Sequence, residues 1–282
     1  MNELVLVTGA SGVLGRAVVS ALSGAGVAVR QGVRNPEKAT PGAESVRLDY
    51  ADPATFVSAM DSARGLVLMA PPLDGEAPVT LAPVIAQAKN SGIQHIVFIS
   101  AFRMNHNEPA PLRVVEQMVI ESGVPYTILR PNFFMENFSE GSVAGTINGQ
   151  NGIFVAAGDG RTSFISVHDI AASVVAAFET PLKNMEFDLT GPEALDHTEV
   201  AKIMADVSGR PVAYHSLTDE QMTGGARAAG MPEPAVGYLA VLYGVVRAGY
   251  AAGITSDVET VTSKKPVTFK TFAERTASSW RT

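Results

Sequence analysis

The chain of 282 residues contains no cysteine, and only 17% of its residues are charged. The absence of cysteine excludes disulfide bonds, thiolate metal sites and cysteine nucleophiles. The five histidines show no spacing typical of metal ligands. A net charge of −7 argues against electrostatic binding of nucleic acid. No apolar stretch approaches the roughly 20 residues of a membrane helix, and the N-terminus has no basic signal-peptide segment. We therefore expect a soluble, cytoplasmic protein whose partners are small molecules.

A glycine-rich turn between an apolar strand and a helix stands at the start of the chain, in Val7-Thr8-Gly9-Ala10-Ser11-Gly12-Val13-Leu14-Gly15. Glycines let the backbone approach a phosphate without a Cβ clash, and the N–H groups at a helix N-terminus attract anions. The turn therefore predicts a dinucleotide pyrophosphate site formed by Gly9, Ser11, Gly12, Val13 and Leu14. The alternative is a turn whose glycines serve only close packing of the helix on the sheet.

Short apolar runs alternate with helix-length segments after this turn. The expected strands are Leu4–Val7, Ala28–Val33, Ser45–Leu48, Gly65–Met69, His95–Ser100 and Tyr126–Leu129, with Met185–Leu189 as a seventh. This alternation predicts an α/β fold, a Rossmann-type doubly wound parallel sheet of six or seven strands.

The pattern changes in the last third of the chain. Helices are expected at Thr198–Val207, Asp219–Ala229 and Ala235–Ala251, with a short strand at Val212–Ser216. We expect an NAD(P)-binding domain over residues 1–155 and a small, mainly helical substrate lobe over 156–282. Strands near 163–166 and 185–189 should return to the main domain.

Three local signals refine this outline. Asp52-Pro53 predicts a side-chain cap followed by a proline at the first helical position, and Ser166-x-x-Asp169 has the spacing of a capping box. The connection from Asn132 to Phe164 contains too many glycines for a regular crossover helix. It is expected to be either a loop that closes over a ligand or a solvated surface excursion.

Arg34 follows the second strand, where NAD-specific sheets carry an acidic residue that binds the ribose 2′-hydroxyl. A guanidinium would instead pair with a 2′-phosphate, with Lys38 as a second cation. The sequence thus favours NADP(H) over NAD(H), although Arg34 could also be solvated or lie flat on the adenine. Asp49 could accept a hydrogen bond from the adenine amino group, or simply form a turn. Ala70 and Pro71 end the fourth strand, where small residues would let the cofactor lie against the backbone.

Five segments together resemble the atypical short-chain dehydrogenase/reductases, specifically the NmrA-like group, which includes reductases of quinones and triphenylmethane dyes. The resemblance rests on Val7–Gly15, Val33–Asn35, Leu48–Tyr50, Gly123–Asn132 and Phe164–Ala171. It implies the fold and a nicotinamide cofactor. It does not fix the reaction, because the group also contains tailoring enzymes of aromatic natural products and catalytically silent redox sensors.

The chain departs from the wider superfamily in lacking its catalytic Tyr-x-x-x-Lys, since the matching positions fall near Glu108 and Leu112. Neither side chain can supply the activated phenol. Ser100, His106 and Arg113 are the remaining catalytic candidates, each with a structural alternative. Ser100 is the position at which the superfamily often has a substrate-polarising hydroxyl, but without the tyrosine a strand-end cap is favoured.

The acceptor side of the site is expected directly after the sixth strand. Aromatic side chains at the carboxyl end of a strand suit a flat apolar acceptor, and their alternative is ordinary core packing. The expected substrate-binding residues are Asn132, Phe133, Phe134, Phe138 and Phe164.

These observations predict an NAD(P)H-dependent oxidoreductase that reduces a planar aromatic or quinonoid small molecule by hydride transfer. Strong electrophiles need little acid catalysis, so positioning against the nicotinamide could suffice. The alternatives are a tailoring enzyme of aromatic polyketides, including an oxygenation, and a non-catalytic NADP(H) redox sensor. A homodimer is left open.

Overall fold

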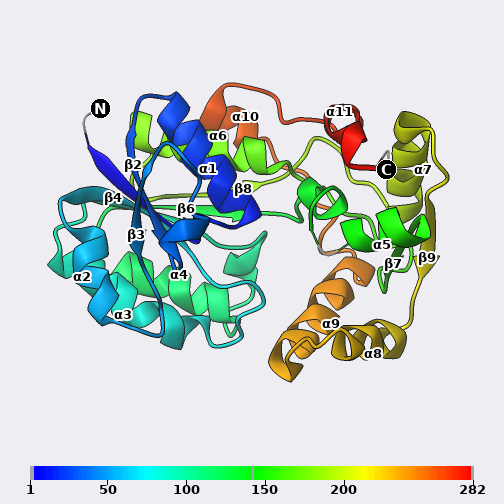
Figure 1. Ribbon diagram of the computed structural model, residues 1–282, viewed down its shortest axis with the longest axis horizontal. Coiled ribbons are helices and arrows are strands. Elements are labelled where there is room, and N and C mark those ends of the chain that lie inside the picture. The colour runs from blue at the N-terminus through cyan, green and yellow to red at the C-terminus, as the bar shows by residue number, and fades with distance from the viewer. Residues whose placement is uncertain (1–2, 142, 281–282) are drawn as a thin grey trace.

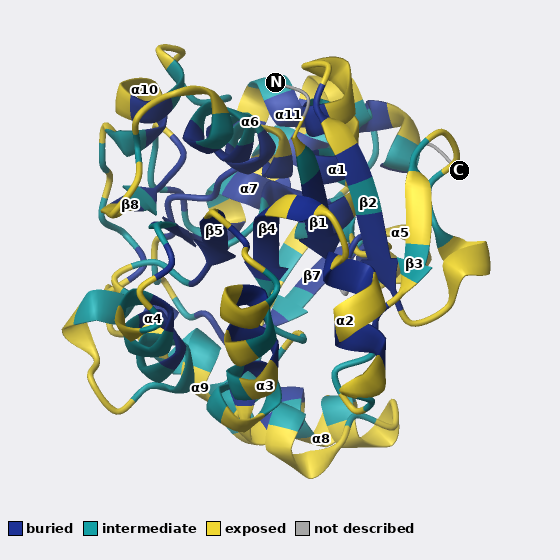
Figure 2. Cartoon of the chain, turned by 90° about the vertical axis from the view of Figure 1, so that its left-hand side faces the viewer, coloured by how far each residue is buried: buried dark blue, intermediate teal, exposed yellow. Residues whose placement is uncertain are grey.

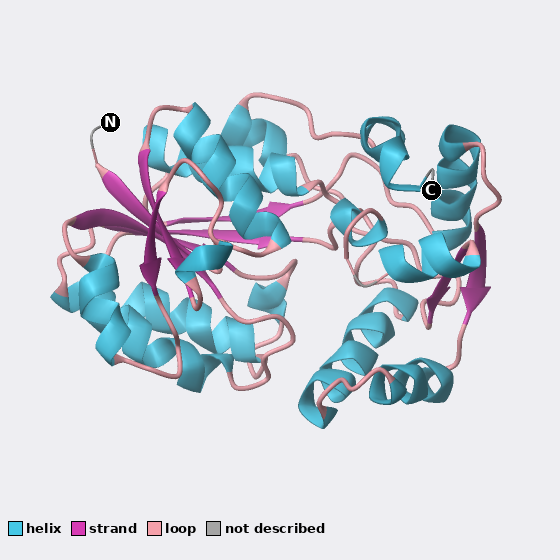
Figure 3. Ribbon diagram, viewed as in Figure 1, coloured by secondary structure: helices cyan, strands magenta, loops and turns pink. Residues whose placement is uncertain are grey.

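The computed structural model describes residues 3–141 and 143–280, which form two lobes of different composition. Figure 1 and Figure 3 show an α/β lobe that begins at the N-terminus and a mainly helical lobe that contains the last helix. In the residues described, no helix is long and apolar enough to cross a membrane.

The first lobe is built on a seven-stranded sheet in which every neighbouring pair is parallel. Its strand order is β3-β2-β1-β4-β5-β6-β8. The strands are β1 (Leu4–Thr8), β2 (Ala28–Val33), β3 (Glu44–Arg47), β4 (Ala63–Met69), β5 (His95–Ile99), β6 (Tyr126–Pro131) and β8 (Met185–Leu189). The order reverses between β1 and β4, and ligands of such sheets bind at this point, beyond the carboxyl ends of the strands. The expected doubly wound sheet is confirmed, with seven strands.

Alternate residues of these strands pack against helices on opposite faces. Val5, Val7 and Val97 point to the side of α1 (Val13–Gly24), α6 (Val167–Glu179) and α10 (Asp257–Thr262). Leu6 and Phe98 point to the other side, which is covered by α2 (Ala54–Met60), α3 (Ala77–Asn90) and α4 (Pro111–Glu121). Figure 2 shows the central strands buried and the outer sides of α2 and α3 exposed. Burial on both faces explains why the strands read as continuous apolar runs.

The second lobe has its own hydrophobic core and a two-stranded parallel sheet of β7 (Gly152–Val155) and β9 (Ala213–Ser216). Its helices are α5 (Ala144–Gln150), α7 (His197–Ser208), α8 (Asp219–Ala228), α9 (Glu233–Arg247) and α11 (Phe269–Thr276). Short 3₁₀ turns occur at η1 (Pro36–Lys38), η2 (Met104–His106), η3 (Met135–Phe138) and η4 (Ala277–Trp280). The helical character expected for the C-terminal lobe is confirmed.

The connection from Asn132 to Phe164 is neither a closing loop nor a solvated excursion. It contains η3, α5 and β7, and it contributes Met135, Phe138 and Ile153 to the core of the second lobe. Conversely, α6, β8 and α10 belong to the first lobe although they come later in the chain. The boundary between residues 155 and 156 therefore stays a prediction from the sequence. Residues before it contribute to the core of the second lobe, and residues after it contribute to the core of the first lobe.

Three local expectations need correction. No strand covers residues 163–166, because Ile165 forms a single bridge with Phe134 while Thr162 bridges to a different partner, Leu195. Ser166 does cap α6 by accepting from the His168 N–H, but Asp169 does not complete a capping box. Its carboxylate accepts instead from the N–H of Val267, 2.8 Å away. A helix does begin next to Asp52-Pro53, at Ala54, but no side chain caps the N-terminus of α2.

Candidate functional site at the carboxyl edge of the sheet

The glycine turn at the end of β1 has the geometry of an anion cradle. Gly9 has a φ of +60°, which favours glycine, and Gly12 precedes α1 with no side chain bonded to the free N–H groups. A Cβ on Gly15 would lie 2.2 Å from the Gly9 carbonyl oxygen, so this glycine lets α1 pack against the turn. Thr8 Oγ1 accepts from the Met69 N–H at 2.9 Å and holds the ends of β1 and β4 together. The turn thus combines close packing with an open helix N-terminus.

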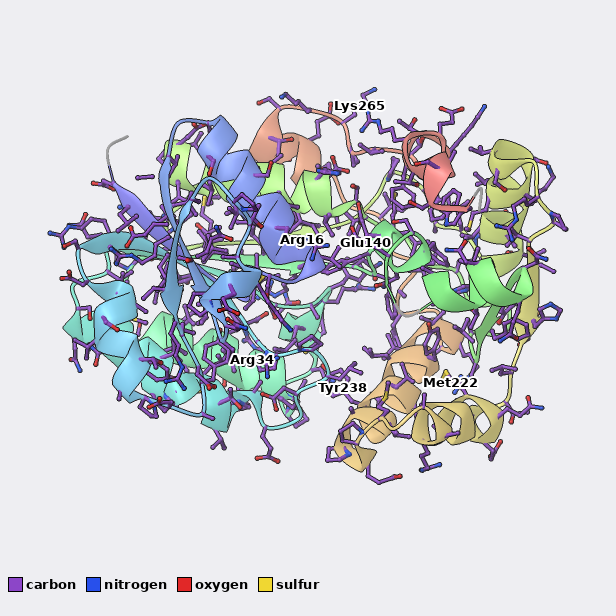
Figure 4. The ribbon with its side chains drawn as sticks, viewed as in Figure 1. Arg16, Arg34, Glu140, Met222, Tyr238 and Lys265 are labelled. Atoms are coloured by element: carbon purple, nitrogen blue, oxygen red, sulfur yellow. The ribbon has the colours of Figure 1, made fainter. Side chains whose placement is uncertain are left out.

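Arg16 joins this turn to the second lobe. Its guanidinium donates to the Ser11 carbonyl at 2.8 Å and forms a 2.5 Å ion pair with Glu140, which follows η3. Figure 4 shows the two side chains meeting where the lobes adjoin. Both are partly exposed, so the ion pair itself contributes at most about 1 kcal/mol. Its effect is to fix the turn relative to the second lobe.

Arg34 and Lys38 are both exposed after the carboxyl end of β2, and Lys38 is the last residue of η1. Asn35 caps η1 by accepting from the Glu37 N–H at 3.0 Å, which fixes the backbone next to Arg34. In the described part of the chain, neither cation has a hydrogen-bond or ion-pair partner. Figure 4 shows Arg34 on the first lobe, below the glycine turn in that view. Two unpaired cations at this edge fit an additional phosphate group.

Asp49 is less available than the sequence suggests. Its carboxylate accepts from the Ala51 N–H at 3.2 Å and lies 3.6 Å from the Arg47 guanidinium. Ala70 and Pro71 are half-buried directly after β4. Tyr50, between these segments, donates to the Met69 carbonyl at 2.7 Å, and burial raises its pKa. The edge of the sheet around β4 is therefore held by hydrogen bonds between neighbouring strands.

The three catalytic candidates lie in different environments. Ser100 is 7% exposed, and its hydroxyl has no hydrogen-bond partner among the described residues. His106 is exposed on η2. Arg113 forms ion pairs with Glu108 at 3.4 Å and with Glu116 at 3.0 Å. A buried hydroxyl without a partner is uncommon in folded proteins, so Ser100 is the candidate that best fits a ligand contact.

Arg113 lies at the edge of a buried charge cluster, because its partner Glu116 also pairs with Arg130. Arg130 on β6 donates to both oxygens of Glu116, at 2.7 and 2.8 Å, and contacts Glu186 on β8. Hydrogen bonds to these carboxylates raise the pKa of Arg130 against the opposing effect of desolvation. Asp188 lies 3.8 Å away, and burial raises its pKa. The cluster ties α4 to β6 and β8.

The expected substrate residues fall into two groups. Asn132 is buried, and its amide donates to Ser163 Oγ at 2.7 Å and to the Ala251 carbonyl at 2.8 Å. Phe138 and Phe164 are 2% and 3% exposed, with ring centroids 5.3 Å apart in the core of the second lobe. Phe133 and Phe134 are half-buried. Only this second pair retains surface for a ligand, and the first three side chains are occupied by packing or hydrogen bonds.

Several candidate residues were missed by sequence reasoning. Leu73 after β4 and Arg103 after β5 have φ values of +57° and +55°, a conformation that costs large side chains free energy. In the second lobe, the Tyr243 ring lies 6.3 Å from that of Phe133, and burial raises the pKa of Tyr243. Tyr238 also belongs to α9, and burial together with the charge of Asp74 raises its pKa. The signal in the sequence was a helix that is apolar on all sides.

One acidic group behind the turn has a structural explanation. Glu136 is 4% exposed and accepts from Ser166 Oγ at 2.8 Å and from the Val167 N–H at 2.9 Å. It therefore serves the N-terminus of α6, and desolvation raises its pKa. Within residues 3–141 and 143–280, no group of acidic and histidine side chains could hold a metal ion.

The sequence model of the NmrA-like family matches residues 1–274. The chain belongs to the NmrA-like family. The NAD(P)H azoreductase of Xenophilus azovorans is 30% identical over 286 residues, covering 98% of this chain and 99% of that protein. The resemblance expected from the five sequence segments is thus confirmed.

Two solved structures are similar over almost the whole chain. The triphenylmethane reductase of Citrobacter sp. has a TM-score of 0.82 and 22% identity, covering 97% of this chain and 99% of its own. The NADPH-dependent quinone oxidoreductase of Escherichia coli, complexed with NADPH, has a TM-score of 0.83 and 24% identity. It covers 96% of this chain and 99% of its own. At these identities the two structures establish the shared fold.

Proposed function

We propose that the protein is an NADPH-dependent oxidoreductase that reduces planar aromatic or quinonoid small molecules. The glycine turn would hold the pyrophosphate at the N-terminus of α1, where Gly12 leaves the N–H groups uncapped. The fit extends to the second strand, because Arg34 and Lys38 are exposed cations with no partner among the described residues. Two similar proteins are named for NAD(P)H or NADPH use, which supports the same assignment.

The preference for NADP(H) over NAD(H) rests on Arg34. A 2′-phosphate would pair with its planar donor fork, whereas an unphosphorylated ribose offers no charge to bind. Asn35 fixes the backbone beside it, so a bound phosphate would meet a partly ordered group. NAD(H) would lose this contact and keep those made by the glycine turn.

The reacting end of the site lies at β5 and β6. When bound, the cofactor supplies a hydride at its nicotinamide ring. The Ser100 hydroxyl has no partner among the described residues and would donate to an oxygen or nitrogen of the acceptor. Phe133 and Tyr243 would cover one side of the acceptor and exclude water. Acceptors that are already electrophilic need little further proton transfer, which is consistent with the missing Tyr-x-x-x-Lys.

The exposed apolar surface of α9 supports an aromatic acceptor. Val241 is 64% exposed and Val245 37% exposed on this helix, followed by Tyr250 at 64%. Phe133 and Phe134 add half-buried aromatic rings after β6. The buried side chains of Phe138, Phe164 and Asn132 would not touch the acceptor, but would support this surface from the core. Such a surface favours flat, weakly polar molecules.

The observation that carries this proposal is the unpartnered Ser100 hydroxyl at the same sheet edge as the open glycine turn. The test follows NADPH absorbance at 340 nm with quinones, azo dyes and cationic dyes, with and without oxygen. Oxidation that requires an acceptor and proceeds without oxygen is expected. Oxidation that requires oxygen would indicate an oxygenase instead, and tight binding without oxidation would indicate a sensor.

A further inference from the structure

Arg103 has a backbone conformation that its residue type disfavours. Six non-glycine residues in the described chain have positive φ: Ser62, Leu73, Arg103, Asn151, Asn184 and Ser263. Four are serine or asparagine, of which asparagine adopts the left-handed region most readily. The two with large side chains, Leu73 and Arg103, both follow strands at the carboxyl edge of the sheet. Strain of this kind is retained where a side chain must point in a particular direction.

The Arg103 guanidinium takes part in none of the ion pairs formed by the described residues. It makes no hydrogen bond or ion pair with any described residue, and its side chain is exposed. Its central carbon lies 6.0 Å from the centre of the Phe102 ring, within reach of a cation–π contact. The Asp188 carboxylate accepts from the backbone N–H of Arg103, not from its guanidinium, and lies 3.8 Å from the Arg130 guanidinium. The Arg103 guanidinium is therefore a positive charge beside an aromatic ring, without an ion-pair partner among the described residues.

Phe102 connects this charge to the candidate site. The N–H groups of Ser100 and Phe102 donate to the carbonyls of Leu129 and Pro131 on β6, so the segment after β5 stays bonded to β6 beyond Ile99. A Cβ on Gly253 would lie 3.1 Å from the Phe102 ring and 3.9 Å from an Arg103 nitrogen. The segment that connects α9 to α10 thus packs against this ring. The unpartnered hydroxyl of Ser100 belongs to a residue three positions before Arg103 on the same segment.

We propose that Arg103 determines acceptor specificity by binding an anionic substituent, a sulfonate or carboxylate, on the aromatic acceptor. This inference rests on the proposed function, because it places the acceptor beside Ser100 and Phe102. The aromatic body of the acceptor would contact Phe102 and the apolar surface of α9. Its anionic group would receive the planar donors of Arg103. Neutral aromatic molecules of the same shape would bind more weakly.

The test measures binding in the presence of NADP⁺, so that no turnover is required. The ligands are 4-dimethylaminoazobenzene-4′-sulfonate and the matching 4′-sulfonamide, which differ in charge and hardly in shape. Variant Arg103→Asn removes the charge and keeps a residue that adopts positive φ, and Arg103→Lys keeps the charge. Arg64→Asn is the matched control, because Arg64 is also exposed, has no ion-pair partner among the described residues, and is the second residue of β4, at the opposite edge of the sheet.

The wild type and Arg64→Asn are expected to bind the sulfonate about 10- to 100-fold more tightly than the sulfonamide, the range of one charge-assisted contact. Arg103→Asn should lose this preference and Arg103→Lys should retain part of it, with unchanged affinity for NADPH. Equal affinities for the two dyes in the wild type, or a preference retained by Arg103→Asn, would overturn the inference alone. If neither dye binds, the proposed aromatic acceptor site fails with it.

Discussion

The substitution Gly15→Ala tests whether the glycine turn is held by packing, and Gly12→Ala tests whether it holds a ligand. An alanine Cβ at position 15 would lie 2.2 Å from the Gly9 oxygen, 2.7 Å from Ala10 Cα and 2.9 Å from the Gly9 carbonyl carbon. All three contacts are with backbone, so no side-chain rotation relieves them. Overpacking typically costs about 1–3 kcal/mol. We expect a cost in the upper part of this range. The better helix propensity of alanine reduces that cost by about 1 kcal/mol.

Position 12 differs in both respects. Its φ of −76° suits alanine, and the added Cβ would lie 3.3 Å from the Gly9 oxygen, which a small shift relieves. The free energy of unfolding should therefore change by less than about 1 kcal/mol. The methyl group would nevertheless stand in front of the uncapped N–H groups of α1. We expect the affinity for NADPH to fall at least about tenfold, a loss of about 1.4 kcal/mol.

Urea denaturation and calorimetric titration with NADPH together separate the two effects. Gly15→Ala should unfold at lower urea concentration, and Gly12→Ala should keep its midpoint and lose affinity. A Gly15→Ala variant as stable as the wild type would refute the packing argument. A folded Gly12→Ala variant with unchanged affinity for NADPH would refute the assignment of the turn to phosphate binding.

Three further predictions concern the cofactor, the aromatic residues and pH. Arg34→Ala should weaken NADPH by about 1.5–3 kcal/mol and leave NADH nearly unchanged in calorimetric titration; equal losses would mean that Arg34 packs on the adenine. Phe138→Ala should cost about 3–5 kcal/mol of stability by denaturation, whereas Phe133→Ala should mainly lower kcat/KM for the acceptor; reversed effects would contradict the division between core and site. Burial lowers the pKa of His95 from 6.5 to about 4, so its contribution to stability should be complete above pH 6.5 and fall as the pH drops toward 4. Over this interval His95→Gln should lose less stability than the wild type, and equal slopes in urea denaturation would contradict the assignment.

The fold of the first lobe was largely predictable because each of its strands is a local pattern. The expected strand Ala28–Val33 has those bounds in the structure, and Met185–Leu189 joins the same sheet. The pairing of β7 with β9 was not predictable, since it joins residues some 60 positions apart through four-residue strands. Short apolar runs of this kind do not reveal their partners.

The candidate site was predictable where the backbone dictates residue type. Gly9 and Gly15 identify the turn because the positive φ of the first and the close backbone contacts of the second exclude most other residues. Aromatic residues carry no such restriction, so the sequence did not distinguish Phe138 in the core from Phe133 at the surface. Arg103 was missed because its significance depends on a positive φ and on the absence of a described partner.

The central claim is that the acceptor receives a hydride directly from the nicotinamide of NADPH. The most direct test is an anaerobic single turnover of NADPH deuterated at the transferred position of C4, with a triphenylmethane dye that carries sulfonate groups as acceptor. Hydride transfer to its central carbon forms a C–H bond that does not exchange with water. The account predicts one deuterium in the reduced dye by mass spectrometry and a slower rate than with unlabelled NADPH. Reduced dye without deuterium, or no reduction of any aromatic acceptor, would contradict it.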